Sequence, residues 1–138
     1  GAELLEENDL LDRADELVES YSHGMKQRLV LSAARLHKPP LLIVDEPMVG
    51  LDPHGARRIK DTFRAIAAAN RTVFLSTHSL DTAQEVCDRI GILYKGRIIR
   101  LDSVDEILSS SQGEDLEQIF LEITEEARAQ TPFTEPQE

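Results

Sequence analysis

The feature that most constrains the fold is a short apolar run that ends abruptly in two carboxylates. Residues 41–44 read Leu-Leu-Ile-Val, and Asp45 and Glu46 follow at once. A continuous apolar run of this length is typical of a strand in a parallel sheet that is covered on both faces. We therefore expect a buried strand whose carboxyl end presents Asp45 and Glu46 to a site outside the sheet.

A helix and a second strand are predicted directly after this run. Asp52 is suited to be an N-cap and Pro53 a first helical residue, and the helix that they open should close near Asn70. Its inner face should carry Ile59, Phe63 and Ile66. Residues 72–75 then predict another strand. A strand, a crossover helix and a strand form a βαβ unit, so the fold class is α/β, with parallel strands and a right-handed connection.

Polar residues after the second strand should lie at the same edge of the sheet as the two carboxylates. His78 follows that strand, and we expect it beside Asp45 and Glu46. Such a group can serve phosphoryl transfer, with Asp45 holding Mg²⁺, directly or through water, and Glu46 orienting or deprotonating the attacking water. His78 could contact a terminal phosphate and keep Glu46 in register. Taken alone, the carboxylate pair is better explained by an ordinary polar strand end, and a lone histidine is more often a surface or capping residue.

A second candidate for phosphate contact lies upstream of the apolar run. Ser22 predicts the N-cap of a helix that should be buried on more than one face and that Pro39 and Pro40 should end. Its hydroxyl and the free amides of residues 23–25 form a suitable anion site. Gly24 lacks a Cβ and would let a phosphate approach the backbone. An ordinary N-cap also explains Ser22.

The rest of the chain predicts smaller elements. Before the apolar run, residues 10–19 predict short amphipathic helices. After the βαβ unit, we expect a helix from the cap Ser79 to Cys87, a hairpin of residues 90–93 and 97–101, and a short helix opened by a capping box of Ser103 and Glu106. A flexible break at residues 109–113 and a helix over residues 114–130 should follow. Cys87 is the only cysteine. We expect it to be reduced and buried in the core.

Composition argues against several classes of protein. Lys and Arg total 15 against 26 Asp and Glu, for a net charge of −11, which disfavours broad binding to nucleic acid or to an anionic membrane surface. No apolar stretch approaches the roughly 20 residues of a membrane span, and the start of the chain has no signal-peptide features, so we expect a soluble, intracellular protein. The four histidines show no metal-ligand spacing, which argues against a zinc site.

Four runs, in this order, resemble the ATP-binding cassette (ABC) ATPases. They are YSHGMKQR at residues 21–28, LLIVDEP at residues 41–47, GLDP at residues 50–53 and STHS at residues 76–79. The resemblance spans roughly Leu10 to Thr124 and is strongest to ATPase subunits of bacterial multicomponent exporters. It implies a P-loop (RecA-like) nucleotide-binding domain with a parallel βαβ core, followed by a C-terminal hairpin and helices.

The resemblance also implies a role for each run. Residues 22–27 match the signature motif, Asp45 the Walker B aspartate, Glu46 the catalytic glutamate, residues 50–52 the D-loop and His78 the switch histidine. In the family, each ATP site pairs one subunit with the signature of the other, so Ser22, Gly24 and Asp52 should act across a dimer interface. The implied cofactors are ATP and Mg²⁺. The implied partners are a second nucleotide-binding domain and membrane-spanning permease subunits, and nucleic acid is not among them. The resemblance places the ATPase itself in the cytoplasm, peripheral on the inner face of the cell membrane.

One part of the family pattern does not occur in these residues. No GxxxxGK[ST] motif is found in the 138 residues, although the P-loop precedes the signature in the family. We therefore expect the C-terminal part of a nucleotide-binding domain over residues 1–130, with a signature part at 1–38, a Walker B core at 39–101 and helices at 102–130. Residues 131–138 should be a disordered tail.

The same omission has two expected consequences. The P-loop supplies most of the phosphate affinity, so the chain alone should bind ATP poorly and be inactive. Strands that would neighbour the predicted sheet are missing, so uncovered apolar surface should favour self-association.

Two other functional classes stay open. A non-transport ABC ATPase of DNA repair or translation would carry the same four runs, but it would need long coiled coils or a second tandem cassette, which these residues do not contain. Alternatively, the chain is a catalytically dead interaction module.

Overall fold

The computed structural model describes residues 1–109 and 115–130. They belong to two compact units, Gly1–His78 and Ser79–Glu138, and each unit has its own hydrophobic core. The predicted tail at 131–138 and most of the predicted break at 109–113 lie outside the described residues. The predicted division of residues 1–130 into three parts stays a prediction. Among the described helices, none is both long and apolar enough to cross a membrane.

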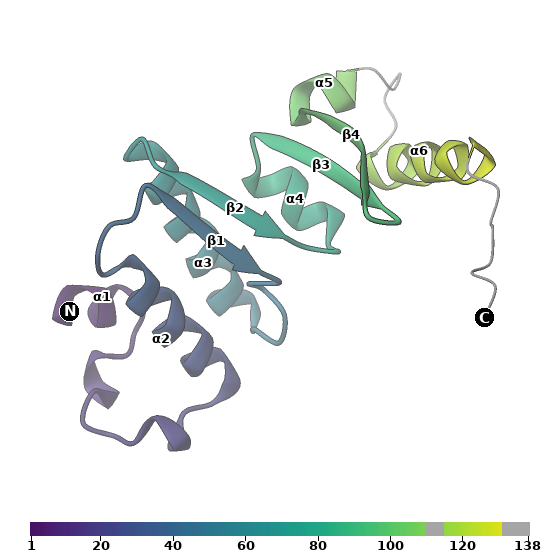
Figure 1. The fold of residues 1–138 in the computed structure, drawn as a ribbon. Helices are drawn as coiled ribbons and strands as arrows, with labels where there is room; N and C mark the ends of the chain where they lie inside the picture. The colour runs from purple at the N-terminus through teal and green to yellow at the C-terminus, as the bar shows by residue number, and fades with distance from the viewer. Residues whose placement is uncertain (110–114, 131–138) are drawn as a thin grey trace, which may run out of the picture. The chain divides into compact units, whose positions relative to one another are not determined.

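The first unit contains the predicted βαβ arrangement. Its elements are α1 (Ala2–Glu7), the 3₁₀ turns Leu11–Arg13 and Val18–Ser20, α2 (His23–Arg35), β1 (Leu41–Asp45), α3 (Pro53–Ala68) and β2 (Thr72–Ser76). Strands β1 and β2 are parallel, and their register runs from Leu41 opposite Thr72 to Asp45 opposite Ser76. Figure 1 shows the two strands side by side with their arrowheads pointing the same way. The carboxyl ends of β1 and β2 therefore meet at one edge, as predicted.

The core of the first unit lies on one face of this two-stranded sheet. Its buried members are Leu31, Leu42, Ile59, Phe63 and Ile66, and Val44, Val73 and Leu75 pack against them. The three residues predicted for the inner face of α3 are all buried. The opposite face of the sheet is open: Ile43 is 68% exposed and Phe74 63%.

The prediction that β1 is covered on both faces is therefore wrong for the described residues. An apolar run reports that both faces are suited to burial, but not whether an element lies over each of them. The open face does agree with the separate expectation of uncovered apolar surface.

Helix α2 is less buried than its sequence predicts. Within it only Leu31 and Ser32 are buried, and Val30 is 68% exposed. The prediction of burial on more than one face is wrong because the apolar residues on the outer side of α2 find no packing partner among the described residues.

The chain before α2 also differs from expectation. The predicted amphipathic helices of residues 10–19 are single 3₁₀ turns, and Leu17 is 76% exposed whereas Leu10 is fully buried. Helix α1 was not predicted. It is held by Asn8, whose Nδ2 donates to Leu4 O at 2.9 Å and to Ser32 Oγ at 2.9 Å.

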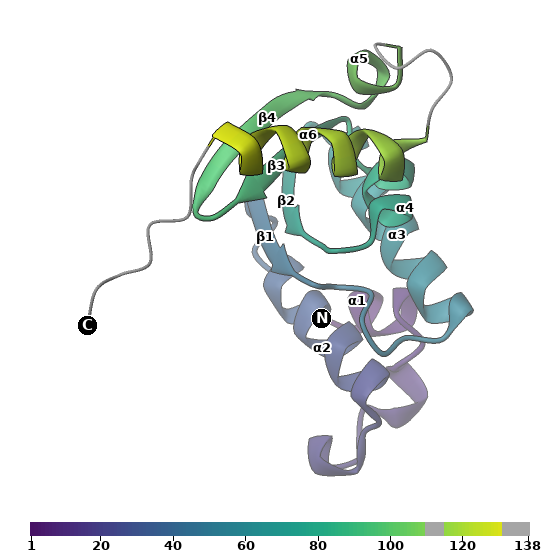
Figure 2. The same cartoon turned by 90° about the vertical axis from the view of Figure 1, so that its right-hand side faces the viewer.

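The second unit is a hairpin with three helices. Its elements are α4 (Leu80–Val86), β3 (Arg89–Tyr94), β4 (Arg97–Ser103), α5 (Val104–Ser109) and α6 (Leu116–Gln130). Strands β3 and β4 are antiparallel, as predicted, and Lys95 and Gly96 turn between them with φ of 47° and 76°. Figure 2 shows α6 along this hairpin, where Leu116 and Ile119 join the core. Cys87 packs against that core but is only half-buried, and this burial raises the pKa of its thiol.

Candidate functional site

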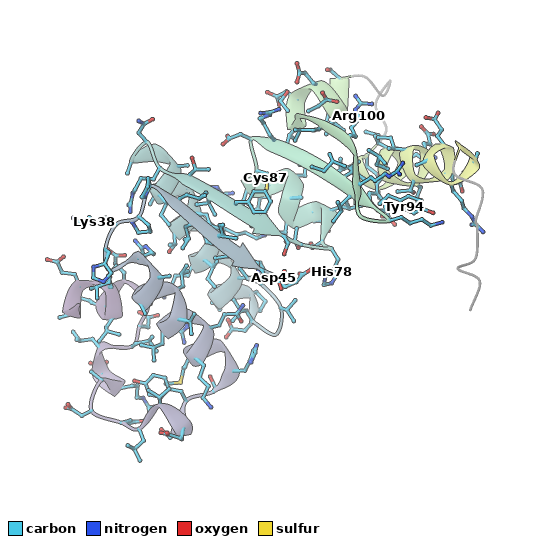
Figure 3. All side chains as sticks on the ribbon, in the orientation of Figure 1. Lys38, Asp45, His78, Cys87, Tyr94 and Arg100 are labelled. Carbon is cyan, nitrogen blue, oxygen red and sulfur yellow. The ribbon has the colours of Figure 1, made fainter. Side chains whose placement is uncertain are left out.

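The carboxyl edge of the β1–β2 pair is held together by hydrogen bonds between the two strand ends. Ser76 Oγ donates to Asp45 Oδ1, and the Glu46 N–H donates to Ser76 O at 3.1 Å. Figure 3 shows Asp45 and His78 near each other at this edge. The two strand ends therefore bring the predicted Asp45, Glu46 and His78 together, as the parallel topology required.

The Glu46 side chain reaches the imidazole of His78. Glu46 Oε1 and His78 Nδ1 are 2.8 Å apart. The carboxylate can only accept, so Nδ1 carries the proton and Nε2 is left for a contact on the outer side of the ring. The side chain of Glu46 is 35% exposed and that of His78 is 79% exposed. The arrangement therefore presents a histidine to solvent with a more sheltered carboxylate behind it.

The backbone of Glu46 has an uncommon conformation. Its φ is 44°, in the left-handed region that residues with a Cβ seldom adopt. Such strain persists only where surrounding contacts impose it, and it is concentrated at functional sites. Positive φ also occurs at Asp9, Lys38, Asn70 and Lys95, so at Glu46 it is the contacts with Ser76 and His78 that tie this conformation to the sheet edge.

The start of α2 has the predicted cap. Ser22 is the N-cap, and its Oγ accepts from the Met25 N–H at 3.3 Å. Gly24 has a packing role, because a Cβ at this position would lie 3.1 Å from Leu51 Cδ2. Its contact with a phosphate stays a prediction. The absence of a side chain at Gly24 is therefore explained by Leu51 even without a bound phosphate.

The start of α3 lies beside the start of α2. Asp52 is the N-cap of α3, and its Oδ1 accepts from the Gly55 N–H at 2.6 Å. Gly50 has φ of 75°, and a Cβ there would meet the His23 ring at 3.0 Å. The N-termini of α2 and α3 both line a cavity of about 530 Å³, to which Ser22, Gly24 and Asp52 contribute along with Arg28 and Arg58.

The six predicted site residues thus form two groups within the first unit. Asp45, Glu46 and His78 meet at the sheet edge, and Ser22, Gly24 and Asp52 line the cavity. Two site residues were missed by the sequence reasoning. Ser76 binds Asp45, and Gln27 Nε2 donates to Pro47 O at 2.7 Å from α2. Both lie inside the recognised runs, which is the only signal that could have found them.

Asp45 fits a role in Mg²⁺ binding. Its carboxylate is exposed at the strand end, and Ser76 Oγ orients one of its oxygens. The described residues contain no group of three or more side chains that could hold a metal. At nucleotide sites, Mg²⁺ is held by one or two carboxylates together with the substrate phosphates, so a single carboxylate is sufficient.

The family comparison covers the part of the chain that contains both groups. A family model described as "AAA domain, putative AbiEii toxin, Type IV TA system" matches residues 5–82. All six predicted site residues fall inside this match.

Curated relatives match most of the chain. It is 46% identical over 105 residues to a fluoroquinolones export ATP-binding protein of Mycobacterium tuberculosis, with 76% of this chain and 35% of the relative covered. It is 36% identical over 127 residues to a linearmycin resistance ATP-binding protein of Bacillus subtilis, with 92% and 41% covered. It is 40% identical over 110 residues to a daunorubicin/doxorubicin resistance ATP-binding protein of Streptomyces peucetius, with 80% and 33% covered. The chain thus spans 33% to 41% of the length of these relatives.

Solved structures agree on the fold. An ATP-binding subunit of an ABC transporter superposes with a TM-score of 0.80 at 34% identity, with 88% of this chain and 52% of that chain covered. An ATP-binding cassette in a dimeric, post-hydrolysis state with ADP and Pi bound superposes with a TM-score of 0.66 at 26% identity, with 74% and 44% covered. Sequence, fold and site geometry agree, and the chain belongs to the family of ABC transporter ATP-binding proteins.

Proposed function

We propose that this chain is part of an ATP-hydrolysing subunit that powers export of a drug-like molecule through separate membrane subunits. The observation that carries the proposal is the 2.8 Å contact between Glu46 Oε1 and His78 Nδ1, beside Asp45 at the carboxyl edge of β1 and β2. The printed names of the relatives, which concern fluoroquinolones, linearmycin and daunorubicin, support antibiotics as the substrate class.

In this proposal the residues at the sheet edge divide the chemistry of hydrolysis. Glu46 acts as general base and accepts a proton from the water that attacks the terminal phosphorus. His78 donates its Nδ1–H to Glu46, which fixes the carboxylate, and turns Nε2 toward the terminal phosphate. Asp45 holds Mg²⁺, directly or through water. The bound ion would neutralise charge on the phosphate oxygens.

The residues around the cavity would act on a different nucleotide. Ser22, Gly24 and Asp52 are proposed to contact ATP that a second nucleotide-binding domain holds, across a dimer interface. The exposed hydroxyl and amides at the start of α2 support this role. The dimeric relative bound to ADP and Pi supports the same assembly. The remaining partners would be permease subunits, with the subunit on the cytoplasmic face of the membrane.

Residues 1–138 by themselves are proposed to hydrolyse little ATP and to self-associate through the open face of the sheet. They contain no GxxxxGK[ST] loop, and that loop supplies the lysine and the amide nest for phosphate. A non-transport ABC ATPase and a catalytically dead module remain the alternatives. Association with membrane permease subunits would distinguish a transporter subunit from a non-transport ABC ATPase. ATP turnover by the complete gene product would exclude a catalytically dead module.

The role of Glu46 is tested by Glu46→Gln in the complete gene product. Loss of the general base should lower the ATPase rate at least about 100-fold, while ATP binding and ATP-driven dimerisation stay intact. The amide keeps the size of the carboxylate, and its oxygen can still accept from His78 Nδ1. Phosphate release measures the ATPase rate, and analytical sedimentation with ATP measures dimerisation. Glu117→Gln on α6 makes the same chemical change at an exposed position and should leave both unchanged. Undiminished hydrolysis by Glu46→Gln would refute the assignment.

A further inference from the structure

The first turns of α2 lie along the loop between β1 and α3. Gln27 Nε2 donates to Pro47 O at 2.7 Å and contacts Glu46 O at 3.4 Å. One turn earlier, the ring of His23 lies where a Cβ on Gly50 would meet it at 3.0 Å. Helix α2 thus contacts the loop both near Pro47, through Gln27, and near Gly50, through His23. The amide of Gln27 is the part of this contact that reaches Glu46.

The amide group of Gln27 makes its hydrogen bonds to the loop between β1 and α3. Two consecutive carbonyls, those of Glu46 and Pro47, face its Nε2, and an amide oxygen in that place would be repelled by both. Its Oε1 is buried and has no hydrogen-bond partner among the described residues. A buried acceptor without a partner lowers the stability of the fold. The presence of Gln27 is therefore better explained by its contact with the loop than by a contribution to stability.

Glu46 is held by three contacts with distant segments, and the Val49 N–H also donates to its carbonyl at 3.2 Å. The Glu46 N–H donates to Ser76 O at 3.1 Å on β2, its side chain contacts His78 Nδ1 at 2.8 Å, and its carbonyl faces Gln27 Nε2 from α2. Its φ of 44° is unfavourable for a residue with a Cβ. A strained turn of this kind relaxes when one of its anchors is lost, and relaxation would swing the carboxylate away from His78.

We propose that Gln27 is a positioning residue that holds the strained Glu46 turn, and with it the Glu46 carboxylate, in register with His78. The proposal rests on the role of Glu46 as general base. It also links α2 to the chemistry, because the helix that begins at the Ser22 cap is the one that carries Gln27. A displacement of the α2 N-terminus would act on Glu46 through the Gln27 amide.

The test compares three substitutions at one position in the complete gene product. Gln27→Ala should lower kcat for ATP hydrolysis about tenfold, the equivalent of one lost hydrogen bond, with KM for ATP within about twofold, because Gln27 does not touch the nucleotide in this proposal. Gln27→Lys keeps a donor that can reach both carbonyls and should recover part of kcat. Gln27→Glu places an acceptor against the same carbonyls and should be at least as slow as Gln27→Ala.

A double substitution separates positioning from general destabilisation. In the Glu46→Gln background, Gln27→Ala should cause no further loss of the residual hydrolysis, because the group that it positions is already removed. Gln118→Ala makes the same change on α6, where the lost bond is an exposed one to Glu122 at 3.2 Å, and should leave kcat unchanged.

The outcomes distinguish this inference from the function on which it rests. If Glu46→Gln abolishes turnover but Gln27→Ala keeps full kcat, the positioning role is wrong and the general base stands. If Glu46→Gln keeps full activity, the general base itself is wrong. Equal losses from Gln27→Ala in both backgrounds, without recovery by Gln27→Lys, would assign Gln27 to structural stability only.

Discussion

Helices α2, α3 and α4 each open with a backbone N–H that donates to a capping side chain three positions earlier. Ser22 accepts from the Met25 N–H, Asp52 from the Gly55 N–H and Ser79 from the Thr82 N–H. All three caps were predicted from the sequence. A cap depends on residues three positions apart, so the local sequence contains all the information that the bond needs.

The conformation of Glu46 is a residue-scale feature that the sequence did not predict. A glutamate after a buried strand ordinarily continues extended or turns with negative φ, whereas here φ is 44°. Besides a local bond from the Val49 N–H to its carbonyl, its backbone donates to Ser76 O, 30 positions downstream, and faces Gln27 Nε2, 19 positions upstream. Local propensity carries no trace of partners so distant in the chain.

Gly50 offers a stability test at the same scale. It combines φ of 75° with a His23 ring that would lie 3.0 Å from an added Cβ, whereas Gly96 has φ of 76° and nothing within 4 Å of the same position. Gly50→Ala should lower the free energy of unfolding by more than the roughly 1–2 kcal/mol expected for left-handed strain alone. Gly96→Ala should show the loss of free energy of unfolding that comes from the left-handed backbone alone. Urea denaturation measures both, and equal losses would show that the His23 contact adds nothing.

At the scale of elements, the capping box of α5 was predicted and is formed in full. Ser103 Oγ donates to Glu106 Oε2 at 2.6 Å, the Ser103 N–H donates to the same oxygen at 3.1 Å, and the Glu106 N–H donates back to Ser103 Oγ at 3.2 Å. Side-chain and then backbone hydrogen bonds from Ser103 lower the pKa of Glu106.

Ser103→Ala should therefore raise the Glu106 pKa toward its ordinary value. Because the folded pKa is below the unfolded one, this carboxylate stabilises the fold above the unfolded pKa, and the contribution is lost as pH falls through the folded pKa. The loss of stability from Ser103→Ala should thus be larger at neutral pH than at acid pH. NMR titration of the Glu106 side chain follows the pKa, and Ser20→Ala, where the lost hydrogen bond goes to Leu17 O, is the matched control. An unchanged Glu106 pKa would contradict the assigned cause.

The burial of elements was harder to predict than their existence. The strands, α3 and the hairpin all occur where the periodicity put them. The predicted burial of α2 and of the outer face of β1 was wrong, since Val30 and Ile43 are both 68% exposed. Periodicity shows which residues are suited to a core, but the packing of another element decides whether that core is completed.

At the scale of the whole molecule, an apolar sheet face without cover has consequences for solubility. Ile43 and Phe74 are paired in register across β1 and β2, and both are exposed. Exposed apolar patches of this kind promote association. If the chain self-associates, we therefore expect the contact to form through Ile43 and Phe74.

Replacing Ile43 and Phe74 together by Thr should reduce self-association of the 138-residue chain. Thr keeps a β-branched side chain suited to a strand but removes most of the apolar surface. Analytical sedimentation over a range of concentrations should show a loss of concentration dependence in the double variant. Val30→Thr changes an equally exposed apolar side chain on α2 and should behave like the parent chain. Sedimentation of the parent as a monomer at high concentration would argue against the surface.

The sequence by itself determined the order of the elements from α2 onward, their caps and the identity of the family. It also brought Asp45, Glu46 and His78 to one edge, because parallel strands in a βαβ unit must end together. Only the tertiary structure decided that Glu46 adopts a strained turn facing His78, that Gln27 reaches that turn from α2, and which face of the sheet stays open among the described residues. These features depend on contacts between segments distant in the chain, whose geometry no local pattern of residues encodes.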